Sequence, residues 1–368
     1  MQIDPKVLNN DERAGCVLRS LYRRFGYCQY KMSKFEEYAL YVRHKDFLAS
    51  DGIISFTDTN GRLLALKPDV TLSIINNSKD LPGQVQKLYY DENVYRISKS
   101  SRSYKEIKQT GLECMGDVGL YELCEVLMLA IRSLESISPD YIFEISHVGL
   151  LEAVLAQLSL EEKTQKQVIS CINRKNAGEL HELCADSALK PGTEEQLAVF
   201  MKSYASVDMA LAALEQVCTG AEARRALEEF AQMLRFVEDM GYAANTRVDF
   251  SLTNDMSYYS GVAFRGYIQG IPTGVLSGGQ YDKIMRRMGK SASAVGFAVY
   301  LDSLERFNRP NKEYDGDILL LHGGDMIQAM KAAEALSGDG SSVRISAQVP
   351  EGLRFRQIIR LAGKEEGQ

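Results

Sequence analysis

The spacing of apolar residues predicts helices and strands in the first part of the chain. From Ala14 to Phe25 apolar residues recur with the period of an amphipathic helix, and Gly26 closes the run. The helical period returns from Leu120 to Leu134, whereas Tyr141–Ile145 is a short apolar run typical of a buried strand.

Two pairs of β-rich runs are predicted to form hairpins. Ile53–Asp58 and the apolar run after it flank a Thr-Asn-Gly turn at 59–61, a strong hairpin signal. Leu88–Ile97 and Tyr104–Glu113 flank Ser98–Ser103, a polar segment too long for a tight turn and suited to closing over a ligand. The second of these runs has no cleanly apolar side. It therefore suits either a polar pocket floor or a solvated edge hairpin, and alternation alone favours the edge.

The pattern changes to helices after residue 147. No convincing strand interrupts the helical segments, which are 148–158, 162–175, 207–217 and 222–239. Pro191-Gly192 marks a break between two helical pairs. Strand character returns at Thr246–Leu252. The tail is predicted to contain, in order, a strand at Asp317–Leu321, a helix at Met326–Leu336, a strand at Val343–Val349 and a last short helix.

Composition narrows the class of protein. The chain has 368 residues, 45% hydrophobic and 25% charged, as expected of a globular protein with two or three domains. Seven cysteines without a C-x-x-C pair and four scattered histidines predict neither disulfides nor a metal site. The absence of a signal core or long apolar run predicts a cytoplasmic protein without a membrane span. A net charge of −6 disfavours tRNA as a partner.

One motif lies on the second predicted hairpin. Val94-Tyr95-Arg96 and the run Tyr104–Glu113 resemble motif 2 of class II aminoacyl-tRNA synthetases, in the form used by histidyl-tRNA synthetase. The resemblance implies that Arg96 takes the position of the ligand of the ATP α-phosphate, and that Gln109 and Glu113 hold histidine. Ser98 stands where the motif carries an acidic residue, so the ATP-facing half is altered.

A second motif precedes this hairpin. Lys67-Pro68-Asp69-Val70-Thr71 resembles the R-P-E-x-T segment of histidyl-tRNA synthetase, which implies that Asp69 and Thr71 contact the α-amino group of histidine. The chemistry fits, because an ammonium in a partly dry pocket needs a carboxylate and a hydroxyl to replace its hydration. The alternative is that Asp69 and Thr71 simply cap a helix.

The third motif resembles the histidine-specific signature R-G-L-D-Y-Y-T-G-x-x-F and spans residues 254–264. It implies that Tyr258 and Tyr259 line the imidazole pocket, unless they lie in a strand and point to opposite faces. Asn254 and Ser257 replace the arginine and aspartate of the signature. Because asparagine has no charge, it cannot neutralise a phosphate as the arginine does.

The remaining motifs concern the nucleotide side. Residues 276–282 resemble the G-G-R-Y-D loop of the family, with a turn before a helix as the alternative. Residues 293–304 resemble motif 3, in which a helix carries an arginine that binds ATP. Here Ser303 replaces that arginine and Tyr300 replaces a glycine, so a tyrosine would fill space next to the nucleotide and the helix would be only structural.

Taken together, the resemblance implies an α+β fold: a class II aminoacyl-tRNA synthetase-like antiparallel sheet flanked by helices. The expected domains are a core of 1–147 and 241–309, a helical insertion at 148–240 and a reduced anticodon-binding-like α/β module at 314–368. The expected histidine-binding residues are Asp69, Thr71, Arg96, Gln109, Glu113, Tyr258 and Tyr259. The degenerate ATP-site positions are Ser98, Asn254 and Ser303. No catalytic residue, cofactor or metal is expected.

A synthetase-like chain that keeps the amino-acid pocket and loses nucleotide ligands resembles the regulatory subunits of ATP phosphoribosyltransferase. This resemblance implies a hetero-oligomer with the short catalytic phosphoribosyltransferase of histidine biosynthesis, with L-histidine as effector. Residues 26–36 resemble motif 1 of the synthetases and imply a homodimer. A divergent histidine–tRNA ligase and a free-standing histidine-binding module remain alternatives.

Overall fold

A computed structural model describes residues 8–48, 52–79, 83–97, 102–186, 191–255, 258–304, 307 and 314–361, without the side chains of 46 and 253–255. The chain forms two compact units, one of residues 11–305 and the other containing residues 314–361. Within the described ranges, no helix is long and apolar enough to cross a lipid bilayer.

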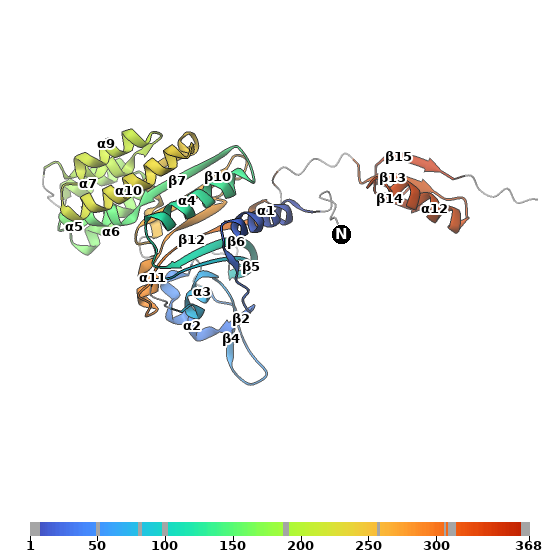
Figure 1. Cartoon of the computed structure of the whole chain (residues 1–368), viewed down its shortest axis with the longest axis horizontal. Coiled ribbons are helices and arrows are strands. Elements are labelled where there is room, and N and C mark those ends of the chain that lie inside the picture. The colour runs from blue at the N-terminus through green and yellow to red at the C-terminus, as the bar shows by residue number, and fades with distance from the viewer. Residues whose placement is uncertain are drawn as a thin grey trace, which may run out of the picture. The chain divides into compact units, whose positions relative to one another are not determined.

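The larger unit is built on a nine-stranded sheet (Figure 1). In spatial order its strands are β1 (Cys28–Gln29), β5 (Val85–Ile97), β6 (Tyr104–Gly116), β12 (Ser293–Tyr300), β11 (Leu276–Gln280), β10 (Val262–Ile268), β7 (Tyr141–His147), β9 (Thr246–Asp249) and β8 (Ser203–Tyr204). The β1–β5 and β7–β9 pairs are parallel and the other pairs are antiparallel. The expected α+β class, with an antiparallel sheet flanked by helices, is confirmed.

The long β5–β6 hairpin confirms the strand pair predicted around the polar segment 98–103. Because β6 pairs with β12 from Gln109 to Gly116, this half of β6 lies inside the sheet, and the alternative of an edge hairpin is wrong for it, whereas Tyr104–Glu106 are exposed. Gln109 and Glu113 of β6 face a pocket, as described below.

Helices α1 (Asn10–Arg24) and α4 (Leu120–Glu135) cover one face of the sheet. Tyr22 of α1 is fully buried and meets Phe297 of β12 edge to face, with ring centroids 5.8 Å apart. The Tyr22 hydroxyl lies 3.0 Å from the hydroxyl of Ser133 on α4, so the two helices are joined where they meet the sheet. Gly26 ends α1 with a positive φ of 82°, which glycine adopts without strain.

The segment between β1 and β5 covers the other face. It comprises β2 (Phe35–Glu37), α2 (Tyr38–Arg43), the 3₁₀ turn η2 (Lys45–Phe47), β3 (Ser55–Thr57), β4 (Leu63–Leu66) and α3 (Thr71–Asn77). The predicted Asn-Gly hairpin is confirmed as the antiparallel β3–β4 pair. Buried apolar residues of α2 and α3, among them Tyr41, Leu72 and Ile74, form one cluster with Tyr90 of β5.

The segment 148–240 is mainly helical, and its helices gather beside β7 (Figure 1). They are α5 (Val148–Gln157), α6 (Glu162–Arg174), α7 (Ala177–Asp186), α8 (Thr193–Ala198), the 3₁₀ turn η3 (Val199–Met201), α9 (Val207–Val217) and α10 (Ala221–Asp239). The expectation that no strand intervenes is wrong, because β8 pairs with β9. A strand of two residues is too short to show an alternating pattern.

The turn η4 (Ala243–Asn245) precedes β9. The strand ends at Asp249, whereas the sequence predicts that it continues to Leu252. The Asp249 carboxylate accepts a hydrogen bond from Ser251 N at 2.9 Å, which favours the 3₁₀ turn η5 (Phe250–Asp255) over a longer strand. The glycine-rich segment expected as a loop forms β11, followed by α11 (Asp282–Arg287). The expected motif 3 helix is instead β12 and the turn η6 (Leu301–Leu304).

The smaller unit contains a three-stranded parallel sheet in the order β14 (Val343–Ser346), β13 (Gly316–Leu321) and β15 (Phe355–Arg360), with helix α12 (Met326–Ser337). The predicted last helix is wrong, because those residues form β15 beside β13. Tertiary pairing with the apolar β13 outweighs the weak local pattern of this segment.

Candidate functional site

The floor of the main pocket comes from facing residues on β6, β12 and β11. In the β6–β12 ladder Glu113 lies opposite Gly296 and Gln109 lies opposite Tyr300. Ser277 continues the same face on β11. Directly opposed residues of antiparallel strands share one face of the sheet. The strand register therefore brings a carboxyl, an amide and two hydroxyl groups together.

Glu113 is the most enclosed acid of the pocket, with 2% of its surface exposed. Its carboxyl accepts hydrogen bonds from the hydroxyl of Thr71, at 2.7 Å, and from that of Tyr281. Burial raises the pKa of Glu113 to about 8, although both hydrogen bonds act in the opposite direction. A Cβ on Gly296 would lie 1.9 Å from Glu113 Oε2 and 2.5 Å from the backbone oxygen of Leu112, so a larger residue there would displace the carboxyl.

Asp69 lies in the segment that enters α3. One carboxylate oxygen accepts a hydrogen bond from Leu72 N at 2.9 Å, as in a helix cap, but the Thr71 hydroxyl donates to Glu113, so the two residues do not simply cap the helix. Its other oxygen lies 3.9 Å from the Arg96 guanidinium, and burial raises the pKa of Asp69 while Arg96 lowers it. Arg96 also donates from Nε to Pro68 O at 2.9 Å. The cap and the pocket contact therefore occur in the same residue.

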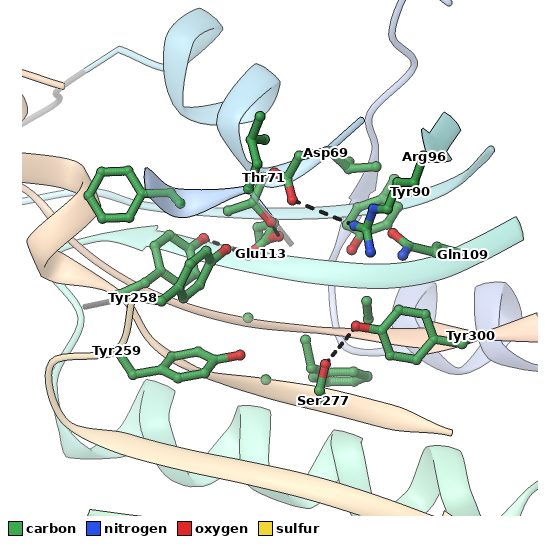
Figure 2. Close-up of a pocket in the computed structure, with 18 residues that line it drawn as sticks. Asp69, Thr71, Tyr90, Arg96, Gln109, Glu113, Tyr258, Tyr259, Ser277 and Tyr300 are labelled. Atoms are coloured by element: carbon green, nitrogen blue, oxygen red, sulfur yellow. Dashed lines mark hydrogen bonds and ion pairs between the residues drawn. The ribbon is translucent and has the colours of Figure 1, made fainter. Parts of the chain in front are cut away.

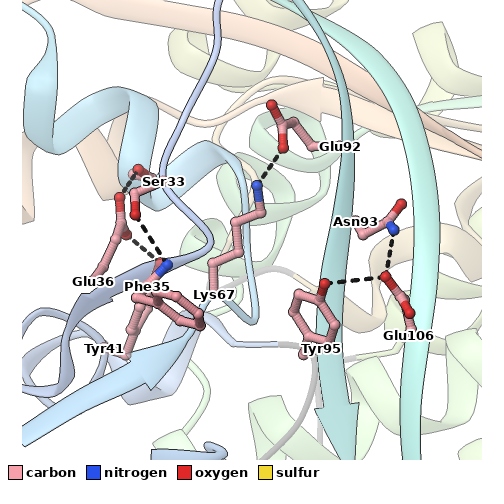
Figure 3. A network of polar contacts seen from close by, with 10 residues as sticks. Ser33, Phe35, Glu36, Tyr41, Lys67, Glu92, Asn93, Tyr95 and Glu106 are labelled. Atoms are coloured by element: carbon pink, nitrogen blue, oxygen red, sulfur yellow. Dashed lines mark hydrogen bonds and ion pairs between the residues drawn. The ribbon is translucent and has the colours of Figure 1, made fainter. Parts of the chain in front are cut away.

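Lys67 holds this segment against β5. Its side chain is 1% exposed, and its ammonium forms an ion pair with Glu92 (Figure 3). Tyr95 N donates to Lys67 O at 2.9 Å. Removing one partner of a buried ion pair leaves an uncompensated charge, so this pair fixes the position of the segment that carries Asp69.

Aromatic rings form the side of the pocket around Glu113 (Figure 2). The rings of Tyr258 and Tyr259 lie 4.9 Å apart at 69°, and Tyr258 also contacts Phe47 and Tyr281. The two adjacent tyrosines lie outside any strand and both line the pocket, so the alternative that they point to opposite faces is wrong. Burial raises the pKa of Tyr258 and of Tyr281, so both phenols stay protonated at neutral pH.

The structure places every expected histidine-binding residue on the lining of this pocket. Figure 2 shows Arg96 and Gln109 toward one end, with Tyr258 and Glu113 toward the other. Further lining residues are not among the expected histidine-binding residues, and they include Phe47, Tyr90, Ser277, Tyr281 and Tyr300. Tyr281 belongs to a quoted motif, but its contact with Glu113 depends on tertiary structure. Of the degenerate positions, Ser98 and the side chain of Asn254 lie outside the description, and Ser303 is half-buried on η6.

The pocket suits a small ligand with a cationic group. Its volume of about 170 Å³ lies below the range of about 300–1,000 Å³ common for drug-sized ligands. Two neighbouring carboxyl groups, Asp69 and Glu113, favour a cation, because burial raises the pKa of both and the Asp69 charge raises that of Glu113 further. Among the described side chains, no three acidic, histidine or cysteine groups are arranged to hold a metal ion.

We expect the ionisation of Glu113 to lower the stability of the ligand-free protein as pH rises. Its folded pKa of about 8 lies above its ordinary value of 4.5, so stability present below the ordinary value is lost as pH rises through the folded one. Denaturant unfolding between about pH 5 and pH 9 should show the parent losing stability relative to Glu113→Gln, which cannot ionise. If the difference in unfolding free energy between the parent and Glu113→Gln did not change with pH, this expectation would be contradicted.

The chain is similar to histidyl-tRNA synthetases and to regulatory subunits of ATP phosphoribosyltransferase. A family model described as histidyl-tRNA synthetase matches residues 2–304. The ATP phosphoribosyltransferase regulatory subunit of Alkaliphilus metalliredigens is 26% identical over 355 residues, which are 93% of this chain and 88% of the relative.

Two solved structures resemble this one. An ATP phosphoribosyltransferase regulatory subunit/histidyl-tRNA synthetase from Bacillus halodurans has a TM-score of 0.77 at 22% identity, covering 99% of this chain and 97% of that one. A chain of the ATP phosphoribosyl transferase (HisG:HisZ) complex from Thermotoga maritima has a TM-score of 0.62 at 20% identity, covering 78% and 96%. At these identities the structures establish the fold. The chain belongs to the histidyl-tRNA synthetase family, and its curated relatives include ATP phosphoribosyltransferase regulatory subunits.

Proposed function

We propose that this protein is a non-catalytic regulatory subunit that binds the short catalytic subunit of ATP phosphoribosyltransferase, raises its activity and senses L-histidine. The names of the curated relatives support the regulatory role, and the complex from Thermotoga maritima supports a catalytic partner. A cytoplasmic location and a homodimer through residues 26–36 belong to the same proposal.

The main structural support is the composition of the pocket. Side chains suited to the α-amino and imidazole groups of histidine gather in one small cavity, with Asp69 and Thr71 beside Glu113 and Tyr258. The sequence carries Asn254 and Ser303 where the synthetases have cationic ATP ligands. A pocket of this kind suits binding of the amino acid better than its activation by ATP.

A subunit without chemistry of its own influences a partner only through binding. Histidine can shift an equilibrium only by its different affinity for two states of the complex. The proposed states differ in the segment 98–103 and in the helical segment 148–240, with histidine favouring the inhibited state. Residues 98–101 lie outside the described structure.

The proposal is tested by mixing the two purified subunits. ATP phosphoribosyltransferase activity should rise when this protein is added and fall again as L-histidine is titrated, and the two proteins should co-elute in size-exclusion chromatography. Unchanged activity without co-elution would reject the partner. Activation that histidine cannot reverse would keep the partner and reject the sensor.

A second assay separates the alternatives. Histidine-dependent exchange of labelled pyrophosphate into ATP at the rate of a synthetase would identify a divergent histidine–tRNA ligase. Histidine binding with neither exchange nor a partner would leave a free-standing histidine-binding module.

A further inference from the structure

The pocket floor along β12 changes abruptly from small side chains to a large one. Gly296, Ala298 and Tyr300 alternate along the strand and all line the pocket. Neither of the first two carries a side chain larger than a methyl group, and the Glu113 carboxyl lies over Gly296. Tyr300 fills the space at the end where Arg96 and Gln109 lie (Figure 2).

The strand register and a hydrogen bond fix the Tyr300 ring. Its hydroxyl lies 2.8 Å from the Ser277 hydroxyl on β11, and its backbone N donates to Val275 O at 2.8 Å. Gln109 lies directly opposite Tyr300 on β6. The pairing of β12 with both of its neighbours fixes the backbone of Tyr300, so the ring lies at this end of the pocket and forms a wall of it.

Arg96 and Gln109 give this end of the pocket its chemistry. The Arg96 guanidinium uses Nε on Pro68 O and stands 3.9 Å from Asp69, which leaves donors for another acceptor. A guanidinium fork and an amide suit a carboxylate. An amino acid whose ammonium meets Asp69 and whose side chain meets Glu113 would present its carboxylate toward this end.

We propose that the Tyr300 ring makes the pocket specific for free amino acids. It closes the space beyond the carboxylate and excludes derivatives substituted there, including esters, amides and acyl-adenylates. This inference rests on the proposed histidine pocket. It identifies Tyr300 as a specificity-determining residue that acts through its ring.

The test measures the affinity of L-histidine and of L-histidine benzyl ester by calorimetry. Esterification removes the charge of the ligand carboxylate for every variant alike. The informative quantity is therefore the dissociation constant of the ester divided by that of histidine. In Tyr300→Gly this ratio should fall at least tenfold below that of the parent, because the ester gains space. Tyr300→Phe keeps the ring and should keep the ratio of the parent.

The outcomes distinguish the inference from the function on which it rests. If the parent binds histidine and the ratio is the same in Tyr300→Gly, or falls equally in Tyr300→Phe, the ring is not the selective element. If the parent does not bind histidine, the proposed sensor fails together with the inference. Tyr300→Ala, which suits a strand better than glycine, is the second variant if Tyr300→Gly does not fold.

Discussion

Glu113→Ala is expected to weaken the binding of L-histidine about thirtyfold or more, because truncating the partner of a buried charged ligand group costs about 2–5 kcal/mol. Glu113 is 2% exposed, so its carboxyl would meet the ligand where solvent screens the contact little. Thr71 and Tyr281 would also lose the acceptor of their hydrogen bonds. Calorimetry at neutral pH measures the change.

Glu106→Ala is the matched control. Glu106 lies on the same strand, but it is exposed and bonds to Asn93 and Tyr95 of β5 (Figure 3). Its removal should leave histidine affinity within about twofold of the parent, since surface substitutions usually have small effects. Equal affinities for Glu113→Ala and the parent would remove Glu113 from the site.

Phe250→Ala is expected to cause the largest loss of stability, about 3–5 kcal/mol of unfolding free energy. The ring is fully buried, and its centroid lies 4.8 Å from that of Phe200 and 6.2 Å from that of Phe230, both in the helical segment. Alanine would leave a cavity where the Phe250 ring now packs against Phe200 and Phe230. Urea unfolding, followed by circular dichroism, measures the loss.

Phe35→Ala removes the same atoms from a surface site and serves as the control. Phe35 is 48% exposed and has an edge-to-face contact with Phe56. Its replacement should cost about 0.5–1.5 kcal/mol, the value of one such contact. Equal losses for the two variants would show that Phe250 does not join the helical segment to the sheet.

The sequence predicts the parts of the site that depend on local patterns. The β5–β6 hairpin follows from its two β-rich runs, and alternation along β6 places Gln109, Gly111 and Glu113 on one face. The motif resemblances select the residues that meet above that face, although the strands that bear them are far apart along the chain.

Long-range contacts account for what the sequence does not predict. The hydroxyl of Tyr281 meets Glu113 across 168 positions of the chain, and no local signal indicates this. Tyr90 enters the pocket through the register of β5 with β6. Strand β15 depends on pairing with β13, so its own residues predict its structure poorly.

Strand β8 has a consequence for the large sheet as a whole. It covers the outer side of β9 through the pairs Ser203–Asp249 and Tyr204–Val248, and it is only two residues long. A long uncovered edge strand offers unpaired backbone groups to other chains, and very short edge strands reduce this risk of aggregation. The helical segment therefore covers the outer side of β9, and deleting residues 148–240 would leave the unpaired backbone groups of β9 at the edge of the sheet.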